Sequence, residues 1–220
     1  MKTKQAGFTL VEIAIVLVII GLLLGGILKG QEMITQAKIK NVVNDFNGIT
    51  AAVNSYQDRY RAMPGDDLGA TARWTTGAVI SGNGNGQIAG LYNAASKATY
   101  TATDESNLFW WHLRLAGFVG GATTGQAAGQ QPNNAVSGIM GVETGVATVS
   151  GLGFTSAIIC SSNLPDKIAI AVDAQMDDSA SNTGQLRGQL QTAPNPNTAA
   201  TATASYAETG TNQYLLCKNM

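Results

Sequence analysis

One carboxylate stands alone in the most apolar stretch of the sequence. From Phe8 to Leu28 there are 21 residues, of which only Glu12 carries a charge, and Lys29 ends the run. A buried carboxylate costs several kcal/mol unless a partner neutralises it. Cleavage after Gly7 would give Phe8 an α-amino group that is mostly protonated at neutral pH. The spacing therefore indicates acid–amine pairing, either within one chain or between Phe8 of one copy and Glu12 of another.

A second interpretation treats Glu12 as a solvated acid near a helix start, where the helix macrodipole stabilises it. The residues on both sides of Glu12 are apolar, however, and are typical of an environment without water. This contrast favours a paired carboxylate.

The processing chemistry is carried by residues 4–12, which read Lys-Gln-Ala-Gly-Phe-Thr-Leu-Val-Glu. This segment resembles the leader and processing site of type IV prepilins and type II secretion pseudopilins, and the resemblance covers about the first 60 residues. It implies that a membrane-embedded prepilin peptidase cuts between Gly7 and Phe8 and N-methylates Phe8. It also implies that Glu12 neutralises the amine of an adjacent subunit while identical subunits assemble into a helical filament.

The same resemblance implies where the protein works. The precursor of such a protein lies in the inner membrane, and pilus or secretion machinery assembles it into a cell-surface, extracellular pilus or a periplasmic pseudopilus. The seven-residue leader followed by phenylalanine is similar to the short-leader pilus type. A type IV pilus subunit is therefore the first expectation and a type II secretion pseudopilin the alternative. A third hypothesis is a signal-anchored periplasmic binding module that does not polymerise.

The chain holds two cysteines, Cys160 and Cys217. Given the export that the resemblance implies, this pair predicts a disulfide formed in an oxidising compartment. Two unpaired buried thiols are the alternative. The sequence has no Cys-x-x-Cys motif and a single histidine, His112, so no zinc or redox motif is present. We expect His112 to pack in the core of the globular part.

Two polar turns contain the oxygen ligands that calcium uses. Asn83 and Asn85 alternate in a glycine-rich loop, as in part of a calcium loop, but the loop itself has no carboxylate. Asp177 and Asp178 lie in a later acidic turn, and some pseudopilins bind calcium in the similar region. Tight turns and helix capping explain both groups as well. We expect no cofactor, and calcium at these residues is the alternative.

The elements that must position these residues begin with one long helix. The apolar run spans a bilayer by its length, and Lys2 and Lys4 before it predict a cytoplasmic N-terminal tail. Residues 31–62 carry apolar side chains at helical spacing: Ile34, Ile39, Val42, Val43, Phe46, Ile49, Val53, Tyr56 and Tyr60. We expect one helix from Phe8 to about Arg61. The regions are then a leader (1–7), a transmembrane and polymerisation part (8–30), an amphipathic part (31–62) and a globular head (63–220).

The head is expected to be a small antiparallel β-sheet with long loops, which gives an α+β fold. A short helix is predicted over 105–116, ended by Gly117. A glycine-, threonine- and alanine-rich surface excursion is expected over 119–153. Strands are predicted at 157–160, 167–172, 185–190 and 214–217.

Composition excludes several classes of function. There are 13 basic and 14 acidic residues, a net charge of −1, and no basic patch that would indicate nucleic-acid binding. The sequence has no Gly-x-Ser-x-Gly, phosphate-binding loop or His-Glu-x-x-His motif, so an enzyme is not expected. A structural subunit is the expectation that fits best.

Overall fold

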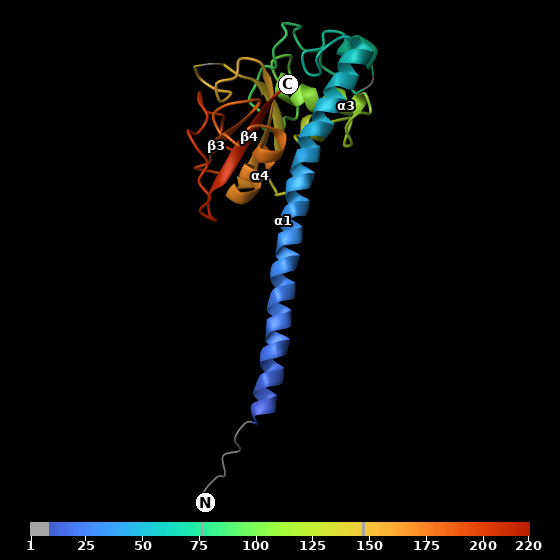
Figure 1. Ribbon diagram of the computed structural model, residues 1–220. Helices are drawn as coiled ribbons and strands as arrows, with labels where there is room; N and C mark the ends of the chain where they lie inside the picture. The colour runs from blue at the N-terminus through green and yellow to red at the C-terminus, as the bar shows by residue number, and fades with distance from the viewer. Residues whose placement is uncertain (1–8, 76, 147) are drawn as a thin grey trace, which may run out of the picture. The chain divides into compact units, whose positions relative to one another are not determined.

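The computed structural model describes residues 9–75, 77–146 and 148–220. The chain divides into two compact units, Met1–Ala37 and Lys38–Met220, and helix α1 (Leu10–Tyr60) contributes residues to both (Figure 1). The predicted α+β fold is confirmed. The predicted helix is also observed, with Leu10 as its first described residue. Its expected first residue, Phe8, lies outside the described residues.

The described part of the first unit is Thr9 and the first part of α1. Its apolar side chains are exposed on all sides of the helix; the large ones run from Leu10 to Ile34. This part of α1 is long and apolar enough to cross a membrane, with a mean hydropathy of 2.8 over its best window. Ile34 is the first residue of the predicted stripe, but it is 58% exposed, so the buried stripe begins later in the helix.

In the second unit, α1 buries the predicted stripe. The buried residues recur every three or four positions: Ile39, Val42, Phe46, Ile49, Ala52, Val53 and Tyr56. The helix ends where Arg61 adopts a left-handed conformation (φ 55°). This half of α1 belongs to the same compact unit as the head.

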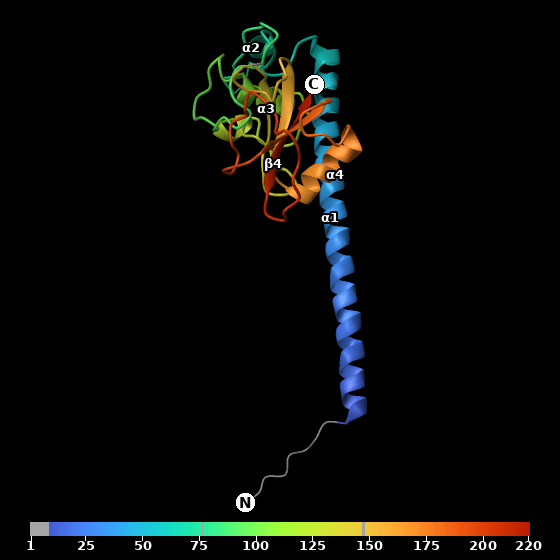
Figure 2. The same ribbon diagram turned by 60° about the vertical axis from the view of Figure 1, so that its left-hand side comes forward.

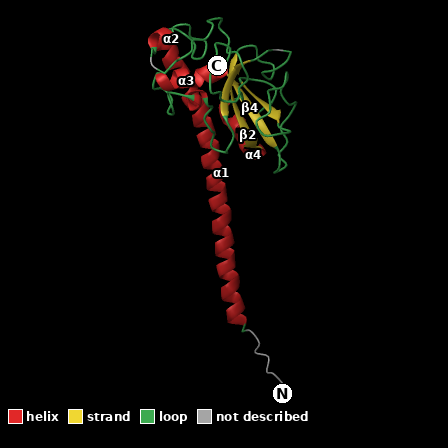
Figure 3. Ribbon diagram, turned by 180° about the vertical axis from the view of Figure 1, so that it is seen from behind, coloured by secondary structure: helices red, strands yellow, loops and turns green. Residues whose placement is uncertain are grey.

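Four antiparallel strands form the sheet in the order β1-β2-β4-β3. Figure 3 draws the strands in yellow and labels β2 and β4. Their bounds are β1 (Met140–Thr144), β2 (Ala157–Pro165), β3 (Leu186–Leu190) and β4 (Gln213–Asn219). Side chains alternate between the two faces, as in any strand. In β4, Tyr214 and Leu216 join the large core cluster, whereas Leu215 and Cys217 join a second, smaller cluster.

Helices cover one face of the sheet. Helices α1, α3 (Glu105–Leu115) and α4 (Asp166–Met176) supply the large cluster together with alternate strand residues. Figure 2 shows α4 beside the second-unit part of α1, with β4 to the left of both. Two one-turn elements, α2 (Ala70–Arg73) and the 3-10 helix η1 (Gln126–Gly129), lie in the long loops. Loops and the disulfide cover the other face.

The strand predicted over 167–172 is wrong, because this segment is part of α4. Pro165 ends β2, and the helix starts at the next residue. The alternation of isoleucine and alanine fits a strand, but the buried residues Ile168, Ala169 and Val172 have the spacing of a helix face. Alanine, the best helix former, occupies positions 169 and 171 of this segment.

The surface excursion predicted over 119–153 is also partly wrong, because it contains β1. The side chains of Met140 and Val142 are buried in the large cluster. Glycine is required at Gly141, where a Cβ would lie 2.0 Å from the backbone oxygen of Tyr92. A strand that alternates with glycine shows no apolar run, which explains why the sequence pattern missed it. β2 is likewise longer than predicted, since it continues through buried serines to Pro165.

The outer edges of the sheet are covered by loops. On β1, the Met140 amide donates to Pro132 O, and the Thr144 amide donates to Ile88 O. On β3, the Gly188 amide donates to Ser181 O, and Gly188 O accepts from the Thr203 amide. The edge strands therefore keep few free backbone groups.

Candidate functional site

Glu12 and Thr9 form a reciprocal cap at the start of α1. The amide and hydroxyl of Thr9 both donate to Glu12 Oε2 at 2.8 Å. The Glu12 amide donates to Thr9 Oγ1 at 3.3 Å. Thr9 precedes the first helical residue and Glu12 is the third, so the geometry is that of a capping box.

This cap is a partner for Glu12 that the sequence analysis missed. The signal was present, because a threonine three residues before a glutamate at a helix start is a capping-box pattern. Gly7 and Phe8, the predicted cleavage position, lie outside the described residues. The pairing of Glu12 with an amine therefore stays a prediction, and Thr9 joins it as a residue that holds the carboxylate.

The apolar helix around Glu12 leaves its side chains without cover in the single chain. The helix runs without a break through Gly21, Gly25 and Gly26, and a Cβ at any of them would meet no atom within 4 Å. Packing inside the chain therefore does not require glycine there. Small residues of this kind allow helices of different chains to approach closely.

A second predicted feature, the disulfide, lies in the sheet. Cys160 of β2 and Cys217 of β4 are paired in register, with Cα atoms 4.0 Å apart, and their sulfurs are bonded. Both residues are buried in the smaller cluster. The bond joins neighbouring strands, so it closes a loop that contains α4, β3 and the long β3–β4 connection.

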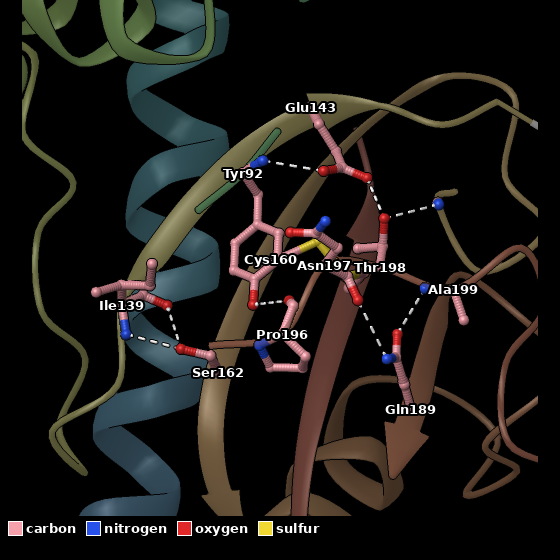
Figure 4. Close-up of a disulfide and its surroundings, with 12 residues drawn as sticks. Tyr92, Ile139, Glu143, Cys160, Ser162, Gln189, Pro196, Asn197, Thr198 and Ala199 are labelled. Carbon is pink, nitrogen blue, oxygen red and sulfur yellow. Dashed lines mark hydrogen bonds between the residues drawn. A yellow bond between two sulfur atoms is a disulfide. The ribbon is translucent and has the colours of Figure 1, made fainter. Parts of the chain in front are cut away.

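The β3–β4 connection covers the disulfide (Figure 4). The Tyr92 hydroxyl donates to Pro196 O at 2.7 Å. Gln189 brackets the same segment, because its Nε2 donates to Asn197 O at 3.2 Å and its Oε1 accepts from the Ala199 amide at 2.7 Å. These bonds hold a loop of irregular backbone against the sheet.

Glu143 is a buried acid in this region. Its side chain is 1% exposed; Oε2 accepts from the Tyr92 amide at 2.9 Å and Oε1 accepts from the Thr198 hydroxyl. Burial raises the pKa of the Glu143 carboxyl, and these two hydrogen bonds oppose the rise. Glu143 therefore links three segments that are far apart in the sequence, at a position buried from solvent.

The acidic turn after α4 brings three carboxylates together. One oxygen of each of Asp173, Asp177 and Asp178 lies within 4.8 Å of the others. Burial raises the pKa of Asp173 to about 6, and the nearby acids add to the rise. Calcium takes oxygen ligands of this type.

Hydrogen bonds within the chain already use these oxygens. Asp173 accepts from the Tyr206 hydroxyl, and Asp177 Oδ2 accepts from the Leu186 amide at 2.7 Å. Asp178 Oδ2 accepts from the Thr183 hydroxyl at 2.6 Å. The geometry gives the cluster a structural role at the end of α4, and calcium at Asp177 and Asp178 stays a prediction.

Asn83 and Asn85 each close a turn. Asn83 Oδ1 accepts from the Asn85 amide at 3.0 Å, and Asn85 Oδ1 accepts from the Gln87 amide at 2.9 Å. Glu105 lies beside this loop, but its Oε1 accepts from the Asn83 amide at 2.9 Å. Asp66 likewise accepts from two loop amides. Carboxylates thus anchor the loop through its backbone, and calcium at Asn83 and Asn85 also stays a prediction.

His112 lies in the core, as expected. Nδ1 accepts from the Gly65 amide at 3.0 Å, so Nε2 carries the proton and donates to Ile80 O at 2.8 Å. Burial lowers the pKa of His112 to about 4. The imidazole is therefore neutral at physiological pH and connects two loops.

Comparison with known protein families supports the resemblance found in the N-terminal segment. A family model described as the prokaryotic N-terminal methylation motif matches residues 2–28. No curated protein and no solved structure matches the chain. The matched residues include the predicted cleavage position at Gly7 and Phe8, the Thr9–Glu12 cap and the apolar run up to Leu28.

Proposed function

We propose that this chain, which carries the N-terminal signal of type IV prepilins and pseudopilins, is a structural subunit of a type IV pilus. The observation that carries the proposal is the methylation motif over residues 2–28, which joins a cleavable leader to an exposed apolar helix with one acid near its start. A helix of this kind needs lipid or other helices around it.

The proposed maturation follows from the chemistry of the first residues. Prepilin peptidase cuts between Gly7 and Phe8 and methylates the new amine of Phe8. This amine is a cation close to Glu12, which Thr9 holds at the helix start. When subunits pack, the amine of an adjacent copy neutralises the carboxylate.

The energetic role of this pair is selectivity. Lipid already solvates the apolar helix, so packing and polar contacts must distinguish the filament from the membrane. A buried ion pair contributes little net stability, but an unpaired buried charge is strongly unfavourable. A subunit that enters the filament out of register would leave Glu12 buried without a partner, and this would destabilise the filament at that position.

The proposal places the precursor in the inner membrane, which the signal and the apolar helix fit. Assembly machinery then moves the mature subunit into a filament of identical copies at the cell surface. The short leader, the long loops and the Cys160–Cys217 bond support a pilus subunit over a type II secretion pseudopilin.

Two measurements test the proposal. Mass spectrometry of the mature chain should find an N-terminus at a methylated Phe8, and sheared filaments should contain this polypeptide. Gly7→Leu should leave an uncut precursor in the membrane. A chain that keeps residues 1–7 under normal expression would refute maturation.

The assembly step is tested by Glu12→Ala. This variant should be processed normally but give no filaments, because the adjacent amine loses its partner. The matched control is Glu32→Ala, which removes an exposed acid of the same helix whose ion pair among the described residues is with Lys29. Normal filaments from Glu12→Ala would contradict the assigned role.

A further inference from the structure

A small pocket of about 280 Å³ opens beside the second-unit part of α1. Its wall includes Asp45, Gly48 and Ile49 of α1, Trp110 of α3, Phe118 and Met140. Small-molecule sites typically measure about 300–1,000 Å³, so this pocket is suited to one long side chain.

Asp45 is the only charged residue in the lining. It is half-buried; burial raises the pKa of its carboxyl, and a hydrogen bond from the Ala135 backbone opposes the rise. None of the ion pairs among the described residues includes Asp45. A half-buried acid without a cation is unfavourable, and a positive group placed in the pocket would correct this.

Gly48 keeps the pocket open. It lies inside a helix, where glycine costs about 1 kcal/mol relative to alanine. A Cβ at Gly48 would meet no atom within 4 Å, so packing within the chain does not require glycine. The missing side chain instead leaves space at the wall of the pocket.

Trp110 forms part of the wall of the pocket. Its side chain is fully buried, and its indole N–H has no hydrogen-bond partner among the described residues. A lysine ammonium has no acceptor to offer this donor, so Trp110 contributes apolar surface to the pocket and no polar contact to the proposed occupant.

We propose that the pocket receives a lysine side chain of a second copy of this chain, with the ammonium at Asp45 and the aliphatic stem against Ile49 and Phe118. This inference rests on the proposed function, which surrounds α1 with identical copies. Charge complementarity supports a second copy, because Lys38, Lys40 and Lys167 are exposed and none is in an ion pair of the described chain.

The contact is heterologous, since the pocket and the lysine are different surfaces of the same molecule. Heterologous contacts repeat from copy to copy, and they build open helical filaments where the rotation between copies does not close a ring. The pocket would therefore add a contact between the globular units to the contact between the N-terminal helices.

Charge reversal is the first test. Asp45→Lys in the full chain should lower the yield of sheared filaments at least roughly tenfold, which corresponds to the loss of one paired charge. A second change to Glu at one of Lys38, Lys40 or Lys167 should restore the yield. The control is Asp58→Lys on the same helix. The side chain of Asp58 is 84% exposed, so reversing its charge should change the filament yield little.

Filling the pocket is the second test, and it separates assembly from folding. Gly48→Ala should raise the unfolding temperature slightly, since the helix gains propensity and nothing is displaced. Gly48→Leu should fold but lower the filament yield like Asp45→Lys. Filament yields equal to the parent's for both Asp45→Lys and Gly48→Leu would overturn the proposal.

Cysteine cross-linking distinguishes failure of the pocket from failure of the proposed function. The described chain has no free cysteine, so Gly48→Cys introduces a single thiol. Copies with Gly48→Cys, mixed in the membrane with copies that carry cysteine at Lys38, Lys40 or Lys167, should form dimers on oxidation. Dimers without filaments would support the pocket and refute the pilus subunit. No dimers with any partner would overturn the pocket, whether or not filaments form.

Discussion

The two parts of α1 obey the same helical geometry but differ in what covers them. From Leu10 to Ile34 the large apolar side chains are exposed, whereas Ile39 to Tyr56 present a buried stripe. The second part folds against its own sheet and helices. The first part has no such cover among the described residues of the chain.

Glycine shows the same contrast. At Gly25 a Cβ would meet nothing within 4 Å, but at Gly141 it would collide with Tyr92 O. Gly141 is therefore needed for packing within the chain itself, whereas Gly25 is not.

Removal of the disulfide should give the largest effect. The double change Cys160→Ala and Cys217→Ala opens a loop with a sequence separation of 57 residues. In the chain-entropy account, this lowers the free energy of unfolding by about 4 kcal/mol. Denaturant unfolding followed by tryptophan fluorescence reports on the second unit, which contains every tryptophan. An unchanged denaturant midpoint would show that the hydrogen bonds of the β3–β4 connection stabilise the second unit without the disulfide.

Gly141→Ala should give the next effect, a loss of about 1–3 kcal/mol, because the strand must move to admit a Cβ. Gly25→Ala is the matched control and should leave the tryptophan transition where it is. Equal effects from the two variants would remove the distinction between the two regions.

The buried acid Asp173 should make stability fall as pH rises. Its pKa is about 6 in the folded chain against 3.8 ordinarily, so the folded state keeps its proton between these values while the unfolded state loses it. The contribution of Asp173 to the free energy of unfolding therefore decreases from about pH 4 to about pH 6 and then levels, while that of His112, whose pKa burial lowers to about 4, rises over the same range. Asp173→Asn should therefore make the free energy of unfolding rise more steeply with pH in this range than it does in the parent chain. A parallel pH profile in the variant would assign the dependence to other groups.

Thr9→Val should give the smallest effect, because it removes one helix cap. The expected cost is about 1 kcal/mol, confined to the first turn of α1. Hydrogen exchange of the full chain in detergent should show faster exchange in this turn for Thr9→Val, and close to parental exchange for Thr9→Ser. Faster exchange throughout the second unit would contradict a local cap.

The long elements were predictable because their signals repeat. Three or more turns of apolar spacing identified α1, and an acidic start with a glycine stop identified α3 (Glu105–Leu115). The prepilin-like signal was equally visible, since it depends on a few residues at fixed spacing. The cysteine pairing followed from there being only two cysteines and from the export that the resemblance implies.

The remaining features depend on contacts between distant residues. The segment over 167–172 satisfies both the strand and the helix period, and only packing selects the helix. Strand β1 exists because Gly141 lets it pass close to Tyr92, which is distant in sequence. The pocket at Asp45 combines residues of three elements, and no local pattern reveals it.

The covered edges of the sheet have a consequence for how copies can associate. Loop backbone already occupies hydrogen-bonding groups along the outer sides of β1 and β3, so a strand from another molecule finds few free positions there. Ordered fibres of this protein should accordingly lack the ~4.7 Å meridional reflection of stacked strands. Their diffraction should instead be dominated by the ~5.4 Å helical pitch of α1.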